Sequence, residues 1–247
     1  MFKSINSSSN PYIKHLCKIR KDRKYRDEQK KLLITGKNVI LEIEKKLEID
    51  TLIYSDDSRK KKIKAKNYLK VTSEILKKIT GLESPEDIAI LIDMPNLGIK
   101  KKERVLILDN ISDPGNLGTL IRSANGLFFD LVILSKGSCD PFNDKSLRAT
   151  KGAVFYIPIV ELEYLDIEKF IKENKLHTYL ASLEGENIKK VIFKKPTALI
   201  LGNEAKGISS SLKNIGKKIK IEMKSSQESL NVATSGSILM YKITELF

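Results

Sequence analysis

The feature that most constrains the fold is a series of short apolar runs that begins at residue 104 and continues to the C-terminal region. Each run has the length of a single strand, and helical stretches separate several of them. The strand-like runs are 105–109, 131–135, 155–160, 178–182, 197–202 and 219–223. Runs that are apolar throughout are typical of strands covered on both faces. The pattern therefore predicts an α/β fold with a mostly parallel sheet.

A smaller α/β unit is predicted before residue 95. Its strand-like runs are 31–35, 50–54, 68–71 and 88–92, and helices are expected at Lys37–Lys46 and Ser73–Ile79. The segment Met94–Glu103 contains a proline, a glycine and three consecutive lysines, which is typical of a linker. We therefore expect two domains, residues 1–95 and 104–247.

Charge is informative because the chain is strongly basic: 45 Lys and Arg against 31 Asp and Glu give a net charge of +14. The run Lys14–Lys31 holds nine Lys or Arg and three acids, and its apolar spacing predicts a basic helix. A second cluster lies at Arg59–Lys66. Such runs are by default solvated surfaces, but they also suit a polyanion, whose counterions are released on binding. Both interpretations stay open.

Cysteine and histidine positions argue against a metal centre. Cys17 and Cys139 lie far apart, and His15 and His177 are isolated, so no disulfide framework or zinc-ligand spacing exists. The N-terminus lacks the apolar core of a signal peptide, and the longest apolar runs are too short to cross a bilayer. We expect no metal, no membrane association and a cytoplasmic location.

Polar segments follow three of the predicted strands, at 110–116, 202–207 and 224–231. Ligands bind at the carboxyl edge of open α/β sheets, where such segments come together. Taken singly, each has a plain interpretation as a turn, a strand–helix connection or a helix cap. Taken together, they predict a binding site. The spacings GxGxxG and GxxxxGK[ST] are absent, which argues against nicotinamide and P-loop enzymes.

Three motifs resemble those of one known family. Residues 116–124 resemble the first motif of the SpoU (TrmH-type) RNA 2′-O-ribose methyltransferases, of the SPOUT superfamily. Residues 201–208 resemble the second motif, and residues 221–223 with 228–233 resemble the third. Order and spacing agree across about residues 104–247. The N-terminal part is similar to the family's substrate-binding extension, an L30e-like domain.

The chain departs from the family's usual pattern at three positions. Phe128 stands where glycine is usual, Glu222 where proline is frequent, and Thr35 where an acidic residue is usual before the glycine. Phe128 is expected to alter how the first helix meets the next strand, and Glu222 to change the rim of the cofactor loop. Thr35 bears on RNA binding.

The resemblance implies a deep trefoil knot in the C-terminal domain, S-adenosylmethionine bound in that knot, and a homodimer whose chains share each site. It implies 2′-O-methylation of a ribose in structured RNA, with 23S ribosomal RNA favoured over transfer RNA. Two rivals remain: a non-catalytic RNA-binding relative, and an unrelated nucleotide-binding α/β enzyme of phosphate chemistry. The rivals would differ in their response to S-adenosylmethionine and in RNA methylation assays.

The resemblance also implies residue roles. Arg122 would contact the target nucleotide and assist deprotonation of its 2′-hydroxyl. Because a guanidinium has a pKa above about 12, orientation and charge stabilisation are favoured over proton abstraction. Asn116 would position Arg122 or the target ribose-phosphate, and Glu204 would orient polar groups. Ser229 and Asn231 would complete the substrate side. The plain alternative for Arg122 is an exposed helical arginine.

The cofactor is expected to rest mainly on backbone groups of the second and third motifs, at Gly202, Ile221, Met223 and Leu230. The loops that bear Asn116, Glu204 and Asn231 are expected to meet around it, close to Arg122. The last helix, from about residue 229 to residue 246, is expected to pack in the core or against a second copy of the chain.

Overall fold

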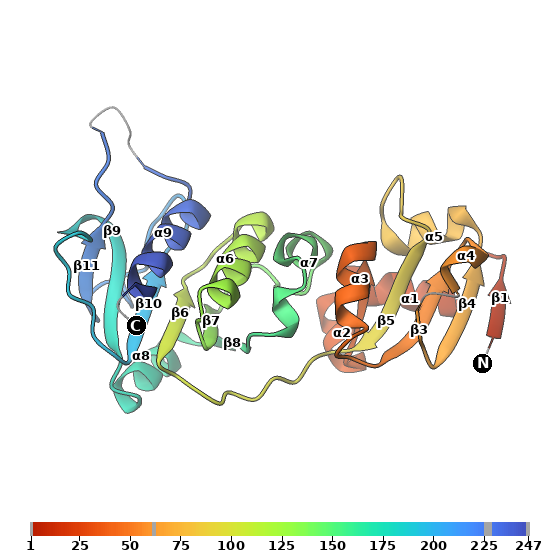
Figure 1. Ribbon diagram of the computed structural model, residues 1–247, viewed down its shortest axis with the longest axis horizontal. Helices are drawn as coiled ribbons and strands as arrows, with labels where there is room; N and C mark the ends of the chain where they lie inside the picture. Colours follow the sequence, from red (N-terminus) through yellow and green to blue (C-terminus); the bar gives the residue numbers. More distant parts are fainter. Residues whose placement is uncertain (1, 61–62, 225–228, 246–247) are drawn as a thin grey trace. The chain divides into compact units, whose positions relative to one another are not determined.

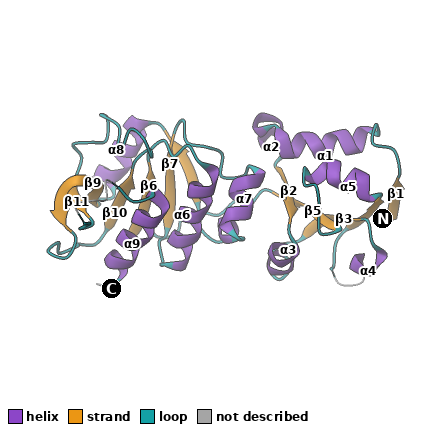
Figure 2. Cartoon of the chain, turned by 90° about the horizontal axis from the view of Figure 1, so that it is seen from above, coloured by secondary structure: helices purple, strands orange, loops and turns teal. Residues whose placement is uncertain are grey.

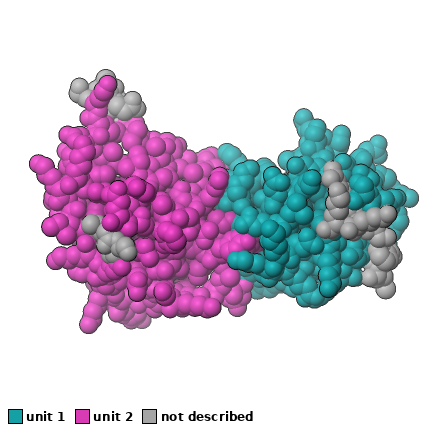
Figure 3. Space-filling model, in the orientation of Figure 1, with its two compact units in different colours: residues 1–95, 142–152 teal, residues 96–141, 153–247 magenta. Residues whose placement is uncertain are grey.

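The computed structural model describes residues 2–60, 63–224 and 229–245. They fall into two compact units: unit 1 comprises residues 1–95 with 142–152, and unit 2 comprises residues 96–141 with 153–247 (Figure 3). Parts of three predicted features lie outside the described residues: 61–62 of the second lysine cluster, 225–228 with Glu228 of the third motif, and Leu246. Within the described ranges, no helix is both long enough and apolar enough to cross a bilayer.

Unit 2 is built on a six-stranded sheet of order β11-β9-β10-β6-β7-β8. Every neighbouring pair in it is parallel, which confirms the predicted parallel α/β fold. Its strands are β6 (Arg104–Leu108), β7 (Leu131–Ser135), β8 (Ile159–Leu162), β9 (His177–Asn187), β10 (Thr197–Leu201) and β11 (Lys217–Lys220).

Helices cover both faces of this sheet. Helices α6 (Pro114–Gly126) and α9 (Val232–Thr244) pack against each other on one face, and α8 (Tyr164–Glu173) lies on the other (Figures 1 and 2). Leu106 and Leu108 of β6 join the core beneath α6 and α9, whereas Val105 and Ile107 join the core beneath α8. Because both faces of β6 are buried, its sequence is apolar throughout rather than alternating.

Unit 1 contains a five-stranded mixed sheet of order β1-β4-β3-β5-β2. Strand β5 runs antiparallel to β2 and β3, and the other pairs are parallel. The strands are β1 (Phe2–Ile5), β2 (Lys31–Thr35), β3 (Ile49–Tyr54), β4 (Asn67–Val71) and β5 (Ile88–Asp93). The helices before residue 95 are α1 (Pro11–Lys21), α2 (Arg23–Gln29), α3 (Lys37–Ile43), α4 (Asp57–Lys60) and α5 (Ser73–Thr80).

The predicted single basic helix is wrong, because the chain forms two helices there. Asp22 leaves the helical conformation, and its carboxylate accepts a hydrogen bond from the Tyr25 backbone N–H at 3.0 Å. A side chain of this type satisfies the free N–H groups of a new helix and so favours a break. Ile13, Leu16 and Ile19 are fully buried on the inner side of α1, which leaves its lysines outward.

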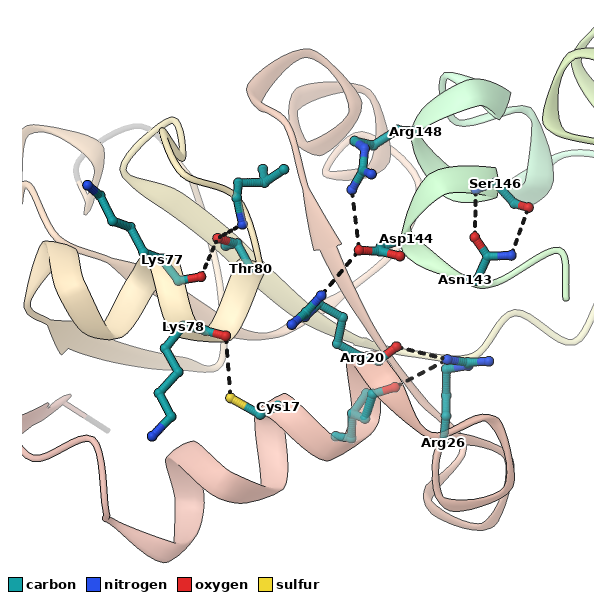
Figure 4. A network of polar contacts seen from close by, with 12 residues as sticks. Cys17, Arg20, Arg26, Lys77, Lys78, Thr80, Asn143, Asp144, Ser146 and Arg148 are labelled. Carbon is teal, nitrogen blue, oxygen red and sulfur yellow. Dashed lines mark hydrogen bonds and ion pairs between the residues drawn. The ribbon is translucent and has the colours of Figure 1, made fainter. Parts of the chain in front are cut away.

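Residues 142–152 follow β7 in sequence but cluster with unit 1. They contain helix α7 (Asp144–Thr150), whose first residue forms an ion pair with Arg20 of α1, Nη1 to Oδ2 at 3.2 Å. Arg148 lies on the same carboxylate at 3.6 Å, so two guanidinium groups converge on Asp144 (Figure 4). This connection spans 124 residues of sequence, and no local pattern could have indicated it.

Two strand predictions are wrong in detail. Residues 155–160 were expected to be extended, but Ala153–Phe155 form the 3-10 helix η1 and β8 begins only at Ile159. Phe155 and Ile157 are buried, so the residues of this run are apolar because they lie in the core, not because they form a strand. The last strand ends at Lys220 rather than at residue 223, and strand β1 was not predicted.

Candidate functional site

Three polar segments meet at the carboxyl edge of the sheet in unit 2. Asn116, in the first turn of α6, donates a hydrogen bond from Nδ2 to Oε1 of Glu204 at 2.9 Å. Asn231, just before α9, donates from Nδ2 to Oδ1 of Asn116 at 3.0 Å. The first of these hydrogen bonds joins residues that are 88 positions apart in the sequence, and the second joins residues that are 115 positions apart. The predicted meeting of these three segments is confirmed.

Asn231 caps helix α9, whereas Asn116 lies in the first turn of α6, whose cap is Asp113. Oδ1 of Asn231 accepts hydrogen bonds from the backbone N–H groups of Ala233 and Thr234, at 2.8 and 3.3 Å, which begins α9. The backbone N–H of Asn116 donates to Asp113, the cap of α6, at 2.8 Å. An amide side chain both donates and accepts, so each asparagine extends the network while its helix is capped.

Glu204 is the acceptor at one end of this network. Its carboxylate also accepts hydrogen bonds from the Ser112 hydroxyl at 3.0 Å and from the Ser112 and Asp113 backbone N–H groups, each at 3.4 Å. Partial burial raises the pKa of Glu204, but hydrogen bonds from Asn116, from its own backbone and from Ser112 outweigh that effect and lower its pKa below the ordinary value. Glu204 is therefore ionised at neutral pH.

The loop that bears Glu204 begins with a glycine that admits no side chain. An added Cβ at Gly202 would lie 2.3 Å from the carbonyl carbon of Gly207 and from the nitrogen of Ile208. The loop closes through two backbone hydrogen bonds between Asn203 and Gly207, at 3.0 and 2.9 Å. The bare backbone of this loop is the kind of surface that can hold a nucleoside through main-chain groups.

The remaining predicted site residues lie in unit 2 as well. Ile221 is partly buried and packs against the core beneath α6 and α9, and Met223 and Leu230 are also partly buried. Ser229 is exposed. The described part of the chain contains no group of three or more His, Cys, Asp or Glu that could hold a metal ion.

Arg122 lies outside the hydrogen-bonded cluster. It is exposed on α6, and within the described ranges no hydrogen bond or ion pair joins it to another residue. It follows Asn116 by six positions, which places it about 240° further around the helix. Arg122 and Asn116 therefore leave α6 on different sides, so the structure does not bring Arg122 to Glu204 within this chain.

Two departures from the family pattern have a structural explanation. Phe128 has a φ of 59°, in the left-handed region that favours glycine, and its side chain is 70% exposed. Glu222 forms an ion pair with Lys189 at 3.0 Å, and that hydrogen bond lowers the pKa of Glu222. Within the described ranges, neither residue forms a hydrogen bond or an ion pair with Glu204, Asn116 or Asn231.

Sequence reasoning missed one buried acid at this edge. Asp109 ends the apolar run 105–109, is 1% exposed, and accepts hydrogen bonds from Ser135, Tyr164 and the backbone N–H of Ser209. The sequence did contain a signal for it, namely an aspartate that directly follows an apolar, buried run. An aspartate in such a place is seldom fully buried unless it has polar partners.

Comparison with known proteins identifies the family. Residues 103–241 match the SpoU rRNA Methylase family, and residues 10–89 match the MRM3-like substrate binding domain. The 23S rRNA (guanosine(2553)-2′-O)-methyltransferase RlmP of Bacillus subtilis is 30% identical over 98% of this chain and 99% of its own length. The mouse mitochondrial rRNA methyltransferase 3 is 28% identical over 90% of this chain and 69% of its own length.

The fold is shared with solved structures of the same kind. An AdoMet-bound rRNA methyltransferase from Sinorhizobium meliloti is similar with a TM-score of 0.83 and 26% identity, covering 99% of this chain and 98% of that one. The family match spans residues that include Asn116, Glu204 and Asn231. With the fold, the meeting of the three motifs and these matches in agreement, the chain belongs to the SpoU rRNA Methylase family.

Proposed function

We propose that this chain transfers the methyl group of S-adenosylmethionine to a ribose 2′-hydroxyl in ribosomal RNA. The observation that carries the proposal is the hydrogen-bonded meeting of Asn116, Glu204 and Asn231 at the carboxyl edge of a parallel sheet. The relatives in Bacillus subtilis and mouse are named as rRNA methyltransferases, and the Sinorhizobium meliloti relative binds AdoMet. These relatives support ribosomal RNA as the substrate, and the Bacillus subtilis relative, which is named for 23S rRNA, supports 23S RNA in particular.

The site fits the cofactor. S-adenosylmethionine supplies an electrophilic methyl group, and the tight loop at Gly202 with the backbone of Ile221, Met223 and Leu230 would hold it. The absence of a side chain at Gly202 lets the backbone of Gly207 and Ile208 pack directly against it, and main-chain groups of this tight loop would recognise the adenine edge. Transfer would need the ribose oxygen in line with the methyl carbon and the departing sulfur, so positioning is the main task of the protein.

Side-chain roles follow from the network. The amides of Asn116 and Asn231 are held in one orientation by Glu204, and would contact the ribose or its phosphate together with Ser229. Arg122 would orient the target nucleotide and stabilise the developing alkoxide, because a guanidinium remains charged at neutral pH. Since Arg122 is exposed and forms no hydrogen bond with the cluster of its own chain among the described residues, we propose a homodimer in which each copy contributes to the other's site. The trefoil knot and the cytoplasmic location remain predictions.

RNA binding is assigned to residues 1–95, and methyl transfer to residues 104–247. The match to a substrate binding domain covers residues 10–89, and α1 carries exposed lysines at positions 14, 18 and 21, on one side of the helix. The Lys18 ammonium lies 4.2 Å from the centre of the Tyr25 ring, so a cation and an aromatic ring lie together near this surface. Such pairs suit a polyanion that also presents bases.

The proposed role of Arg122 is tested with Arg122→Ala. We expect methyl transfer to ribosomal RNA to be lost while S-adenosylmethionine binding, measured by calorimetry, stays at the wild-type level. Lys172→Ala, at an exposed position of α8, is the matched control and should transfer methyl groups normally. Wild-type activity of the Arg122 variant would remove this residue from the mechanism.

RNA binding is tested with the double variant Lys14→Ala, Lys18→Ala. Loss of two phosphate contacts should weaken RNA binding. The slope of the logarithm of the binding constant against the logarithm of the salt concentration should become shallower by about 1.8, while cofactor binding stays unchanged. Lys169→Ala, Lys172→Ala removes the same charge from α8 and should leave the slope unaltered. Equal slopes in both double variants would contradict a role for α1. A chain that binds RNA but fails to bind S-adenosylmethionine would instead be a non-catalytic relative.

A further inference from the structure

Asp109 is a buried carboxylate that connects four parts of unit 2. It stands at the end of β6, and its Oδ1 accepts hydrogen bonds from the Ser135 hydroxyl at 3.2 Å and the Tyr164 hydroxyl at 3.0 Å. Its Oδ2 accepts a hydrogen bond from the backbone N–H of Ser209 at 2.6 Å. Asp109 is 1% exposed, and within the described ranges no ion pair involves it. The hydrogen-bond donors to its carboxyl group are therefore two hydroxyls and one backbone N–H.

The partners of Asp109 show what it holds. Ser135 ends β7, Tyr164 begins α8, and Ser209 follows the loop that carries Glu204. The neighbouring residue, Asn110, accepts a hydrogen bond at its carbonyl oxygen from Nδ2 of Asn203 at 2.8 Å. The segment 203–209 is therefore tied at both ends to two consecutive residues at the end of β6.

The same segment sets the position of Glu204. Oδ1 of Asn203 accepts hydrogen bonds from the backbone N–H groups of Ala205 and Lys206, each at 3.0 Å, which shapes the turn around Glu204. Glu204 then fixes the amide of Asn116, and Asn116 fixes that of Asn231. The buried carboxylate of Asp109 is thus linked to the proposed site by hydrogen bonds at Ser209, Glu204 and Asn116 and by the backbone of segment 203–209 between them.

We propose that Asp109 is the positioning residue of the methyl-transfer site: its carboxylate holds segment 203–209 in place, and thereby holds Glu204 against Asn116. This role rests on the proposed function, but the geometry that it sets can be measured without any substrate. Asp109 is too deeply buried to touch RNA or cofactor, so it acts only through the loop.

Hydrogen-bond chemistry separates two substitutions at this position. The Ser209 N–H can only donate, so the amide oxygen of an Asp109→Asn variant would turn towards it. Its NH₂ group would then face the hydroxyls of Ser135 and Tyr164, which can rotate and accept. Asp109→Asn therefore keeps the three connections, whereas Asp109→Ala removes all of them and leaves buried donors unpaired.

A matched control stands at the opposite end of the same strand. Oδ2 of Asp130 accepts hydrogen bonds from the backbone N–H groups of Glu103 and Arg104, at 3.0 and 2.9 Å, where β6 begins. Asp130→Ala therefore also removes a carboxylate that fixes backbone N–H groups, but at the edge away from Glu204. It should lower stability without moving the proposed site.

The decisive measurement is amide hydrogen exchange of segment 203–209 in the full chain. We expect exchange at Ser209 and along this segment to accelerate in Asp109→Ala, and to stay at the wild-type level in Asp109→Asn and Asp130→Ala. In methyl-transfer assays, kcat of Asp109→Ala should fall on the order of 10–100-fold with KM for RNA unchanged, and Asp109→Asn should restore most of it.

Unchanged protection of segment 203–209 in Asp109→Ala, or an equal fall of kcat in Asp130→Ala, would overturn the proposal. If Asp109→Ala does not fold, Tyr164→Phe is the second variant, because it removes only one hydrogen-bond donor to Asp109. It should give an intermediate acceleration of exchange at Ser209. If exchange at Ser209 is not accelerated, the proposal is overturned. If the wild-type chain transfers no methyl group while exchange follows the expected pattern, the proposed function fails and the positioning role stands.

Discussion

The backbone contact at Gly202 gives a prediction whose size follows from the structure. In Gly202→Ala the new Cβ would lie 2.3 Å from backbone atoms of Gly207 and Ile208, whereas ordinary contact begins at 3.4 Å. The two sides of the loop must therefore separate by 3.4 − 2.3 = 1.1 Å. No side-chain rotation can relieve this contact, because both atoms that it meets belong to the main chain.

A displacement of that size breaks the loop. The Asn203–Gly207 hydrogen bonds, at 3.0 and 2.9 Å, would lengthen beyond hydrogen-bonding distance. Two lost backbone hydrogen bonds correspond to about 1–3 kcal/mol of stability. At roughly 2–4 °C per kcal/mol for a chain of this size, the melting temperature should fall by several degrees in a thermal scan. Affinity for S-adenosylmethionine, measured by calorimetry, should fall about ten-fold or more.

Gly207→Ala is the matched control in the same loop. Gly207 has a φ of 69°, and an added Cβ there would meet nothing within 4 Å. The left-handed backbone would cost about 1–2 kcal/mol, but no neighbouring atom would have to move. The control should therefore lose stability and keep its cofactor affinity. Equal affinities in the two variants would refute the argument that the tight loop at Gly202 shapes the cofactor site.

Three further predictions concern stability, each checked by thermal unfolding. Phe128→Gly should stabilise the chain by about 0.5–1 kcal/mol, since Phe128 is 70% exposed and holds a left-handed φ of 59°; a lower melting temperature would contradict this. Gly236→Ala should destabilise by about 1–3 kcal/mol although alanine favours helices, because its Cβ would lie 2.4 Å from Leu120 Cδ2. Folding lowers the pKa of Glu204, so its contribution to the stability of the fold is complete above the unfolded pKa and is lost as the pH falls through the lower, folded pKa. Glu204→Gln should remove this dependence of stability on pH in the acid range. Identical profiles of melting temperature against pH in the two proteins would argue against it.

Long apolar runs and polar strand ends were the most reliable sequence signals. The runs at 131–135 and 197–202 correspond to β7 and β10, because a strand buried on both faces must be apolar throughout. The segments after β6 and β10 were correctly expected to share one edge, since parallel strands end on the same side. Their motifs also sufficed to identify the family.

Segments whose conformation depends on core packing or on a competition between local alternatives were predicted less well. The run 155–160 is apolar because Phe155 and Ile157 fill the core, yet it is not a strand over that length. The break at Asp22 depends on a local cap that competes with helical continuation, and a charge pattern does not resolve such a competition. Strand β1 could not be distinguished from a loop, because an edge strand of four residues has little apolar pattern.

The sequence by itself determined the parallel α/β fold, the family and the three segments that meet at the carboxyl edge through Asn116, Glu204 and Asn231, because periodicity and motifs are local properties of the chain. Only the tertiary structure decided that Arg122 forms no hydrogen bond with the Glu204 cluster among the described residues, that α7 belongs to unit 1 and pairs with Arg20 through Asp144, and that Asp109 accepts a hydrogen bond from Ser209. Each of these depends on which groups lie within hydrogen-bonding distance after folding. Contacts of that kind join residues about a hundred positions apart, so no window of sequence contains both partners.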